Sequence, residues 1–255
     1  MKILYIILTG QAFEETRNVW AEDTWLKTID TNDDYFFLAE KEDQSKKILG
    51  FDTEGGHQFA FFKLRGLYLD YNKNPQRYND YDWFFFVDSD TYVRTKRTRK
   101  FLNDYSLIED SPMLFGRLNL LPNIENSKTG PGFFGGQSKN QIMPYFKNCP
   151  IVGPWYAHSG GAGWVLNKSG VKKISDYLTN CGEDFPWSQH YDLSHAMWVN
   201  DCDIPMVHSR LFRYETKEKH ASSCEYLDND VITWHYMKEQ DFYSAFTEDT
   251  ENNIG

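Results

Sequence analysis

The stretch that most constrains this chain is a run of large apolar residues that ends abruptly in two acids. Residues Trp83 to Val87 are aromatic or β-branched, and Asp88-Ser89-Asp90 follows at once. A short run that is apolar on both faces predicts a fully buried strand of an α/β sheet. Because ligands bind outside the carboxyl ends of the strands in such sheets, we expect Asp88 and Asp90 at the mouth of a crevice.

Two carboxylates this close repel each other unless a cation lies between them. Hard oxygen ligands of this kind suit Mg²⁺ or Mn²⁺. An acidic turn is the alternative, because Asp and Ser both favour such turns. The position of Asp88 and Asp90 directly after a buried strand favours the metal site.

The bulk composition is that of a globular α/β protein. With 255 residues, 40% of them hydrophobic, the chain can build one large domain with a substantial core. Its formal charge of -10 argues against binding to nucleic acid or to an anionic membrane. The dense basic run at residues 95–100 is typical of a solvated helix start.

The sequence lacks the usual marks of membrane insertion. No apolar stretch approaches the roughly 20 residues that span a bilayer, and residues 1–8 have no small-residue cleavage site of a signal peptide. We therefore expect a soluble protein without a membrane-spanning segment, either cytoplasmic or the catalytic domain of a larger or unanchored protein. The cysteines (Cys149, Cys181, Cys202 and Cys224) lack Cys-x-x-Cys spacing, which argues against zinc and leaves disulfides open.

Apolar patterns along the chain predict alternating strands and helices. We expect strands at residues 2–8, 34–39, 83–87, 113–117 and 231–237, and helices at residues 16–29, 58–71, 98–108 and 169–178. Such alternation predicts βαβ units and a mostly parallel sheet. Residues 120–150 are rich in Pro, Gly and Asn, which indicates a long loop or hairpin region of the kind that carries function.

Three further segments in the second half of the chain are candidates for a functional role. Gly160, Gly161 and Gly163 would let the backbone approach a ligand, although a tight strand entry gives the same pattern. Asp192 stands where a helix should begin, so it is either an N-cap or a general base, and the residues alone favour the cap. His235 is either a core histidine or a metal ligand, and His208 is its competitor.

Taken together and in order, these motifs resemble the Fringe-like, metal-dependent glycosyltransferases, most closely the core 1 β-1,3-galactosyltransferase branch (glycosyltransferase family 31-like). The matching segments are residues 16–25 (Thr-Arg-Asn-Val-Trp-Ala-Glu-Asp-Thr-Trp), 82–93 with Asp-Ser-Asp, 159–166 (Ser-Gly-Gly-Ala-Gly-Trp-Val-Leu), 191–193 (Tyr-Asp-Leu) and 233–236 (Thr-Trp-His-Tyr). They cover nearly the whole chain, from about residue 3 to residue 240. The chain departs from the family pattern at Ser89, Tyr191 and Trp234, where the family has Asp, Glu and Phe.

The resemblance implies an α/β, GT-A-type (Rossmann-like) fold in a single domain over residues 1–255. Residues 1–95 would form the nucleotide-binding half, 96–245 the acceptor-binding half and 246–255 a tail. The implied reaction is the inverting transfer of a hexose (Gal, Glc or GlcNAc class) from a UDP-sugar to a hydroxyl of a glycan or glycoprotein acceptor, in a β-1,3-type linkage.

The resemblance also implies roles for individual residues. Asp88, Asp90 and His235 would bind Mn²⁺ (or Mg²⁺), and Asp192 would be the base. The residues implied for the donor are Thr9, Arg17, Lys63 and Ser89, and those implied for the loop facing donor sugar and acceptor are His158, Gly160, Gly161, Ala162 and Trp187.

The implied chemistry is physically consistent. A divalent ion stabilises the charge that develops on a leaving diphosphate, and an inverting displacement needs one base on the opposite face. The alternatives are a phosphohydrolase of the haloacid dehalogenase type, which resembles the chain only locally, and a non-catalytic sugar- or nucleotide-binding relative. The first places Thr or Val where this chain has Tyr92.

Overall fold

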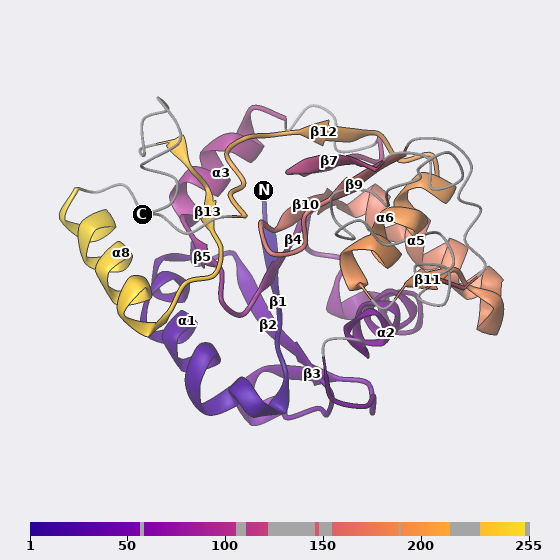
Figure 1. Cartoon of the computed structure of the whole chain (residues 1–255), viewed down its shortest axis with the longest axis horizontal. Helices are drawn as coiled ribbons and strands as arrows, with labels where there is room; N and C mark the ends of the chain where they lie inside the picture. Colours follow the sequence, from indigo (N-terminus) through magenta and orange to yellow (C-terminus); the bar gives the residue numbers. More distant parts are fainter. Residues whose placement is uncertain are drawn as a thin grey trace, which may run out of the picture.

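The computed structural model describes residues 1–56, 59–105, 111–121, 146–147, 155–188, 190–214 and 230–252. Its centre is a seven-stranded sheet with the strand order β12-β6-β10-β4-β1-β2-β3 (Figure 1). These strands are β1 (Ile3–Leu8), β2 (Asp34–Ala39), β3 (Ile48–Gly50), β4 (Trp83–Asp88), β6 (Leu114–Gly116), β10 (Trp164–Asn167) and β12 (Met206–His208). The sheet is mixed and mostly parallel, as expected, because only β10 runs antiparallel to its neighbours β4 and β6.

Strands β1 and β4 form the buried centre of the sheet. Every residue of β1 is buried, and β4 stays buried until Asp88 at its end. Their parallel register places Leu8 opposite Asp88. The segments that follow both strands therefore meet at one edge of the sheet, where side chains are free to contact a ligand.

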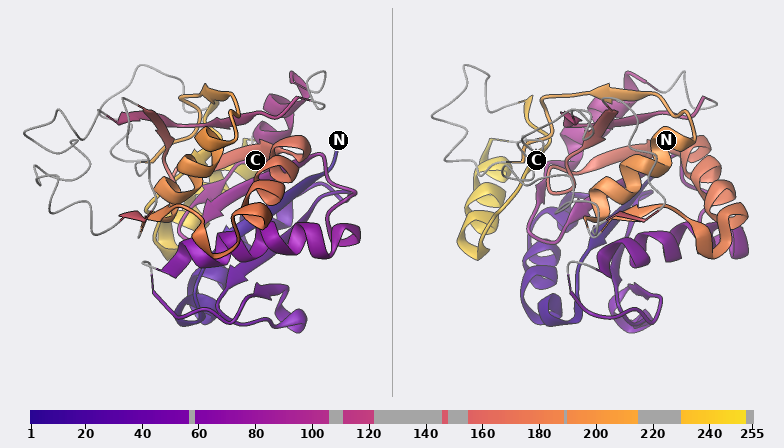
Figure 2. Two further views of the ribbon diagram at one scale, coloured as in Figure 1. Left: turned by 90° about the vertical axis from the view of Figure 1, so that its right-hand side faces the viewer. Right: turned by 45° about the vertical axis from the view of Figure 1, so that its right-hand side comes forward.

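Helices cover both faces of the sheet, and the alternation of side chains along β1 shows how. Leu4, Ile6 and Leu8 point into one core, while Ile3 and its alternate neighbours point into the other, as the two-residue period of a strand requires. The first core includes the helices α2 (Ala60–Lys73), α5 (Lys168–Cys181) and α6 (Tyr191–Asp201), and the second includes α1 (Val19–Asp23), α3 (Thr95–Asn103) and α8 (Glu239–Glu251). In Figure 2, left, the first group lies in front of the sheet and the yellow α8 behind it.

Three short ribbons lie outside the main sheet. They pair β5 (Tyr92–Val93) with β13 (Thr233–Trp234), β7 (Leu118–Leu121) with β9 (Trp155–His158), and β8 (Phe146–Lys147) with β11 (Trp187–Ser188). The expected strand over residues 231–237 is thus much shorter, and it leaves His235 just past its end. Most of the loop region expected at residues 120–150 lies outside the described residues.

The helix expected over residues 16–29 is broken into short pieces. A π-turn over Glu14–Asn18 leads into α1, and a 3₁₀ turn follows over Trp25–Thr28. The break lies at Thr24, whose φ of -121° and ψ of -106° are not helical and whose hydroxyl donates to the carbonyl of Trp20. Threonine hydroxyls compete with helical hydrogen bonds in this way, so the apolar pattern alone overestimated the helix.

Other boundaries differ from expectation by a few residues. The helix expected over 98–108 begins at Thr95 and ends at Asn103, and the one expected over 58–71 spans Ala60–Lys73. The strand expected over 113–117 spans Leu114–Gly116. Cys181 and Cys202 are free thiols, and Cys149 and Cys224 lie outside the described residues.

The segment expected to be a tail from residue 246 begins inside α8, which continues to Glu251. Asp249 of that helix forms a buried ion pair with Arg94, directly after β5 (Nη2 to Oδ1 2.8 Å, Nε to Oδ2 2.9 Å). The pair therefore fastens the end of the chain to the segment that follows the paired aspartates. Among the described residues, no helix is both long enough and apolar enough to cross a bilayer.

Candidate functional site

The two aspartates and His235 come together at the carboxyl edge of the sheet. Asp88 is the last residue of β4 and Asp90 follows in the next turn. The ribbon of β5 and β13 pairs Tyr92 with Trp234, and the amide of Met237 donates to the carbonyl of Asp90 at 3.0 Å. Because Tyr92 and Trp234 flank the aspartate turn and His235, this pairing brings the imidazole to the carboxylates.

The resulting group has the donor set of a divalent cation site. His235 Nε2 lies 3.3 Å from Oδ1 of Asp90 and 3.7 Å from Oδ2 of Asp88. One ligand atom from each residue lies within 4.8 Å of the others. Two partly buried carboxylates and an imidazole fit Mn²⁺ by ligand type, and the carboxylates also suit Mg²⁺.

The electrostatics of the two carboxyls differ although they are neighbours. The pKa of Asp88 is raised to about 6, chiefly by burial and also by the charges of Asp90 and Asp192, while His235 and the hydrogen bond from Tyr191 act in the opposite direction. Burial also raises the pKa of Asp90, but the hydrogen bond from His235 and the charges of His235 and Arg17 hold it below its usual value. The site therefore holds poorly compensated negative charge at its Asp88 end, which a cation would offset.

Arg17 supplies positive charge next to Asp90, at the carboxylate oxygen that does not face His235. Its Nη1 lies 3.3 Å from Oδ2 of Asp90, and its guanidinium carbon lies 4.2 Å from the centre of the Phe13 ring. The π-turn over Glu14–Asn18 carries Arg17 to this position.

A pocket of about 650 Å³, here called pocket A, opens beside the aspartates at the ends of β1, β2 and β4. All four residues predicted for the donor line it, together with both aspartates and His235: Thr9, Arg17, Lys63, Ser89, Asp88, Asp90 and His235. The seven residues that were predicted for the donor and the metal therefore lie around one pocket.

Glu40 in pocket A was not predicted. Its Oε1 lies 2.9 Å from Lys63 Nζ, and its Oε2 accepts from the amide of Gln11 at 2.8 Å. Lys63 also donates to the carbonyl of Thr9 at 2.6 Å, so the ion pair closes the back of the pocket. The signal was available: Glu40 directly follows the predicted strand over residues 34–39, which puts it at the ligand edge of the sheet.

A second pocket of about 520 Å³, pocket B, lies on the other side of the carboxylate and imidazole group. Asp192 lines pocket B but not pocket A. Four residues line both pockets and form the wall between them: Asp88, Tyr191, His235 and Tyr236. The two pockets therefore meet at the candidate metal ligands.

Asp192 is the second residue of α6, and His190 stands at the N-cap position. The N-cap role that the residues alone favoured for Asp192 is therefore wrong. Its Oδ2 accepts from the amide of Gly160 at 3.2 Å and its Oδ1 from the amide of Leu193 at 2.9 Å. A carboxylate in the first turn of a helix is stabilised by the unpaired amides there.

The glycines of the 160–163 loop are explained by close packing against the site. A Cβ at Gly161 would overlap the imidazole of His235, and one at Gly160 would overlap the Tyr191 hydroxyl and lie 3.0 Å from the Cβ of Asp192. The hydroxyl of Thr91 donates to the carbonyl of Gly161 at 2.8 Å. The loop thus supports the side chains of the site from behind, and Gly161 also lines pocket B.

Four of the five residues predicted for this loop region line neither pocket. Gly160 still contacts the site through its amide, which donates to Asp192, and the other three are packed side chains. His158 is buried, with its Nε2 2.6 Å from Nδ1 of His195. Ala162 is buried, and its carbonyl accepts from Thr233. Trp187 stacks on Phe61 with ring centres 4.7 Å apart. The structure places them as packing residues, because the motif predicted their neighbourhood but not which way each side chain points.

Tyr236, which follows His235 in the chain, and the competing histidine His208 complete the description of His235. Tyr236 has a left-handed backbone (φ 57°), and its ring, which is 62% exposed, lies 3.7 Å from the imidazole by ring centres. Such a backbone is costly for a bulky residue and is typical of functional sites. The competitor His208 lies on the outermost strand β12, where its Nδ1 accepts from the amide of Leu118 at 3.1 Å.

The model of the Fringe-like family matches residues 1–251. The chain belongs to the Fringe-like family. This match across nearly the whole sequence bears out the resemblance and displaces the haloacid dehalogenase alternative, which rested on a local likeness.

Relatives and one solved structure agree with this assignment. The chain is 23% identical over 172 residues to glycoprotein-N-acetylgalactosamine 3-beta-galactosyltransferase 1 of Xenopus laevis, covering 67% of this chain and 37% of the relative. It is 25% identical over 181 residues to beta-1,3-N-acetylglucosaminyltransferase lunatic fringe of Danio rerio, covering 69% and 43%. The alignments thus span less than half of each relative.

The fold is similar to the crystal structure of a glycosyltransferase involved in the glycosylation of the major capsid of PBCV-1. The TM-score is 0.51 at 11% identity, with 97% of this chain and 100% of that chain covered. The expected GT-A-type fold is confirmed by this similarity and by the mixed sheet with flanking helices.

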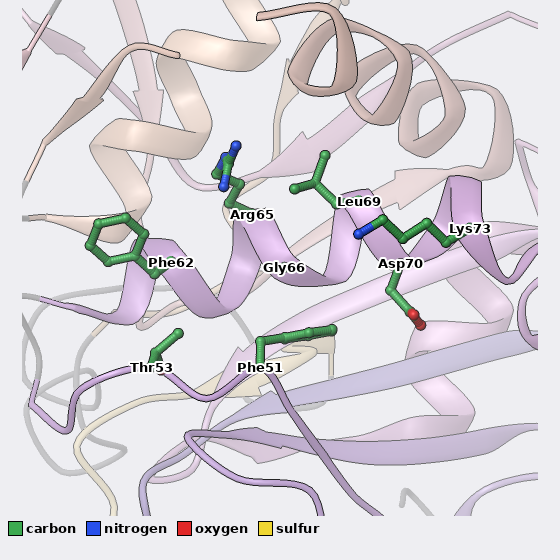
Figure 3. Close-up of a pocket in the computed structure, with 8 residues that line it drawn as sticks. All are labelled: Phe51, Thr53, Phe62, Arg65, Gly66, Leu69, Asp70 and Lys73. Carbon is green, nitrogen blue, oxygen red and sulfur yellow. The ribbon is translucent and has the colours of Figure 1, made fainter. Parts of the chain in front are cut away.

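A further pocket of about 310 Å³ lies along the outer side of α2, away from the aspartates (Figure 3). Two of its polar side chains, Arg65 and Asp70, are engaged with protein groups. Arg65 donates to the carbonyl of Gly182 at 2.8 Å, and Asp70 accepts from Arg77 at 2.8 Å and from Tyr78 at 2.6 Å. The aspartate group and its two pockets remain the better candidate site.

Proposed function

We propose that this Fringe-like chain is an inverting, metal-dependent glycosyltransferase. It transfers a hexose of the Gal, Glc or GlcNAc class from a UDP-sugar to a hydroxyl of a glycan or glycoprotein acceptor, in a β-1,3-type linkage. The observation that carries the proposal is the wall shared by pockets A and B, which contains Asp88 and His235, with Asp192 on the pocket B side alone. This arrangement suits a donor in A, an acceptor in B and the reaction at the wall.

The relatives support the same chemistry. Both are named as β-1,3-specific transferases, one for galactose and one for N-acetylglucosamine. Their different sugars leave the hexose to be found by experiment. The name of the first relative also includes a glycoprotein acceptor, which supports a glycan or glycoprotein acceptor here.

Residues of pocket A bind and orient the donor in this proposal. Asp88, Asp90 and His235 would hold Mn²⁺ or Mg²⁺, which when bound supplies positive charge for the departing diphosphate. Arg17 already faces Asp90 at 3.3 Å and adds a guanidinium suited to phosphate oxygens. The buried Lys63–Glu40 pair, together with Thr9 and Ser89, shapes the remainder of the donor pocket.

Asp192 accepts the proton of the attacking hydroxyl from pocket B. An inverting displacement needs a base on the face of the sugar opposite the leaving group. Pocket B lies across the shared wall from pocket A. With the donor in pocket A, Asp192 would therefore face the sugar from the side opposite the leaving group. The amide of Gly160 donates to its Oδ2 at 3.2 Å and holds the carboxylate in place.

A screen of UDP-sugars tests the proposal directly. UDP release would be measured with each donor, with Mn²⁺ or with chelator, and with and without candidate acceptors bearing β-linked or O-linked sugars. We expect Mn²⁺-dependent release from one donor class that an acceptor strongly increases, together with a glycosylated product seen by mass spectrometry. Absence of acceptor-dependent release with every donor, in protein that is folded and binds Mn²⁺, would contradict the proposal.

A further inference from the structure

Tyr191 contacts the candidate metal site through a short hydrogen bond. Its hydroxyl donates to Oδ1 of Asp88 at 2.6 Å. The side chain is 4% exposed and lines both pockets, so it forms part of the wall between them. A phenol is a neutral donor near neutral pH, whereas the family pattern has a carboxylate at this position.

The bond divides the two oxygens of Asp88 between different partners. Oδ1 accepts from Tyr191, while Oδ2 faces His235 Nε2 at 3.7 Å. The hydroxyl therefore fixes the rotation of the carboxylate and engages one oxygen. Oδ2 is left to face the other ligand atoms.

The hydroxyl is held in its place by the surrounding structure. A side chain at Gly160 would overlap it, so the loop leaves room for this one group. The Tyr191 ring also packs near Trp164, with ring centres 6.2 Å apart. Tyr191 precedes Asp192 in the first turn of α6. The same helix start therefore presents the Tyr191 hydroxyl to Asp88 and the Asp192 carboxylate to pocket B.

We propose that Tyr191 is a positioning residue that makes Asp88 a one-oxygen metal ligand and thereby selects Mn²⁺ or Mg²⁺ over Ca²⁺. The inference rests on the metal site of the proposed function. Ca²⁺ takes about 6–8 oxygens in a flexible shell and can bind both oxygens of a carboxylate, whereas Mg²⁺ demands a near-ideal octahedral shell, in which the short spacing of two oxygens of one carboxylate fits poorly. A hydroxyl that occupies Oδ1 therefore disfavours the larger ion. Groups that orient metal ligands from outside typically change metal affinity by about 10- to 100-fold when removed.

The test measures metal binding by calorimetry on the whole chain without nucleotide or sugar. Mn²⁺ and Ca²⁺ would be titrated into the wild type, Tyr191→Phe and Tyr35→Phe. Tyr35 is the matched control because its hydroxyl contacts Glu22 at 3.3 Å near the opposite end of β2. We expect Tyr191→Phe to bind Mn²⁺ about 10- to 100-fold more weakly and to lose most of the preference for Mn²⁺ over Ca²⁺, while Tyr35→Phe matches the wild type.

Folded Tyr191→Phe that keeps both the Mn²⁺ affinity and the ion preference of the wild type would overturn the inference. If Tyr191→Phe fails to fold, the same titrations are made with Gly160→Ala and judged in the same way. The added methyl group displaces the Tyr191 hydroxyl without removing it. This test can be distinguished from the test of the proposed function, because it measures metal binding and not sugar transfer. Dependence of metal selectivity on Tyr191 upholds the inference even if no sugar is transferred, whereas a wild type that binds no Mn²⁺ defeats both.

Discussion

His235 Nε2 lies 3.3 Å from Oδ1 of Asp90, although the two residues come from opposite halves of the chain. The ribbon of β5 and β13 joins their segments, and the Arg94–Asp249 pair docks α8 onto the same region. The candidate metal site is therefore complete only when the C-terminal segment has packed against the β4 edge.

Replacing His235 by Ala should weaken Mn²⁺ binding by at least about 100-fold, because it removes a direct ligand where loss of an outer contact alone costs about 10- to 100-fold. His208→Ala is the matched control, since that imidazole lies on β12 and contacts the Leu118 amide. Calorimetric titration of both variants with Mn²⁺ gives the answer. If His208→Ala loses the affinity and His235→Ala keeps it, the histidine has been assigned wrongly.

Asp192→Asn should lower the rate of transfer by about 10²- to 10⁴-fold, the usual contribution of a general base. The substituted amide keeps the shape of the side chain but cannot take the proton. UDP affinity should stay within a few-fold of the wild type, because Asp192 does not line pocket A. The measurements are kcat and the UDP dissociation constant, and retained turnover would remove Asp192 as the base.

Arg94→Met should destabilise the protein by about 3–5 kcal/mol, because it leaves the carboxylate of Asp249 buried without its partner. Both side chains are only 1% exposed. The double variant Arg94→Met with Asp249→Leu should recover much of that loss, since a buried ion pair can often be replaced by apolar groups. Urea unfolding measures both, and a single variant as stable as the wild type would show that the pair does not fasten α8.

The free energy of unfolding should decrease as the pH is lowered below about 6.5, the ordinary pKa of histidine. The reason is that His158 and His195 are buried as neutral imidazoles. Burial lowers the pKa of His158 to about 3, and burial and His158 lower that of His195 well below its usual value. As the pH falls from about 6.5 to 5, the unfolded chain takes up protons that the folded chain cannot, and each such group costs up to about 1.4 kcal/mol per pH unit.

His195→Gln removes one of the two groups and should therefore flatten this pH dependence. The measurement is the free energy of unfolding in urea at several pH values between about 5 and 7. An unchanged slope in the variant would show that His195 is protonated in the folded state.

The position of the two carboxylates at the end of a buried strand could be predicted from the sequence because the signal is local. An apolar run that ends in Asp88-Ser89-Asp90 fixes both a buried strand and its carboxyl end. Thr9 and Lys63, which the resemblance implied, line the pocket at the same edge. Glu40 was overlooked although it directly follows the strand predicted over residues 34–39.

The remaining features depend on contacts between distant segments. The residues alone left the choice between His235 and His208 open, and only the family resemblance favoured His235. The pairing of β13 with β5 is the contact that brings His235 to the aspartates. The sequence also could not tell that Trp187 packs on Phe61 instead of facing a pocket, because a motif does not define side-chain direction. The helix expected over residues 16–29 is interrupted at Thr24, whose backbone is not helical and whose hydroxyl donates to the carbonyl of Trp20.

The most direct test of the central claim is a pair of calorimetric titrations of UDP, one with saturating Mn²⁺ and one with chelator. If Asp88, Asp90 and His235 hold a cation that contacts the diphosphate, UDP should bind at least about 10-fold more tightly with Mn²⁺, a difference of about 1.4 kcal/mol. The Asp90→Asn variant should lose most of this difference. Equal UDP affinity with Mn²⁺ and with chelator in the wild type would contradict the account.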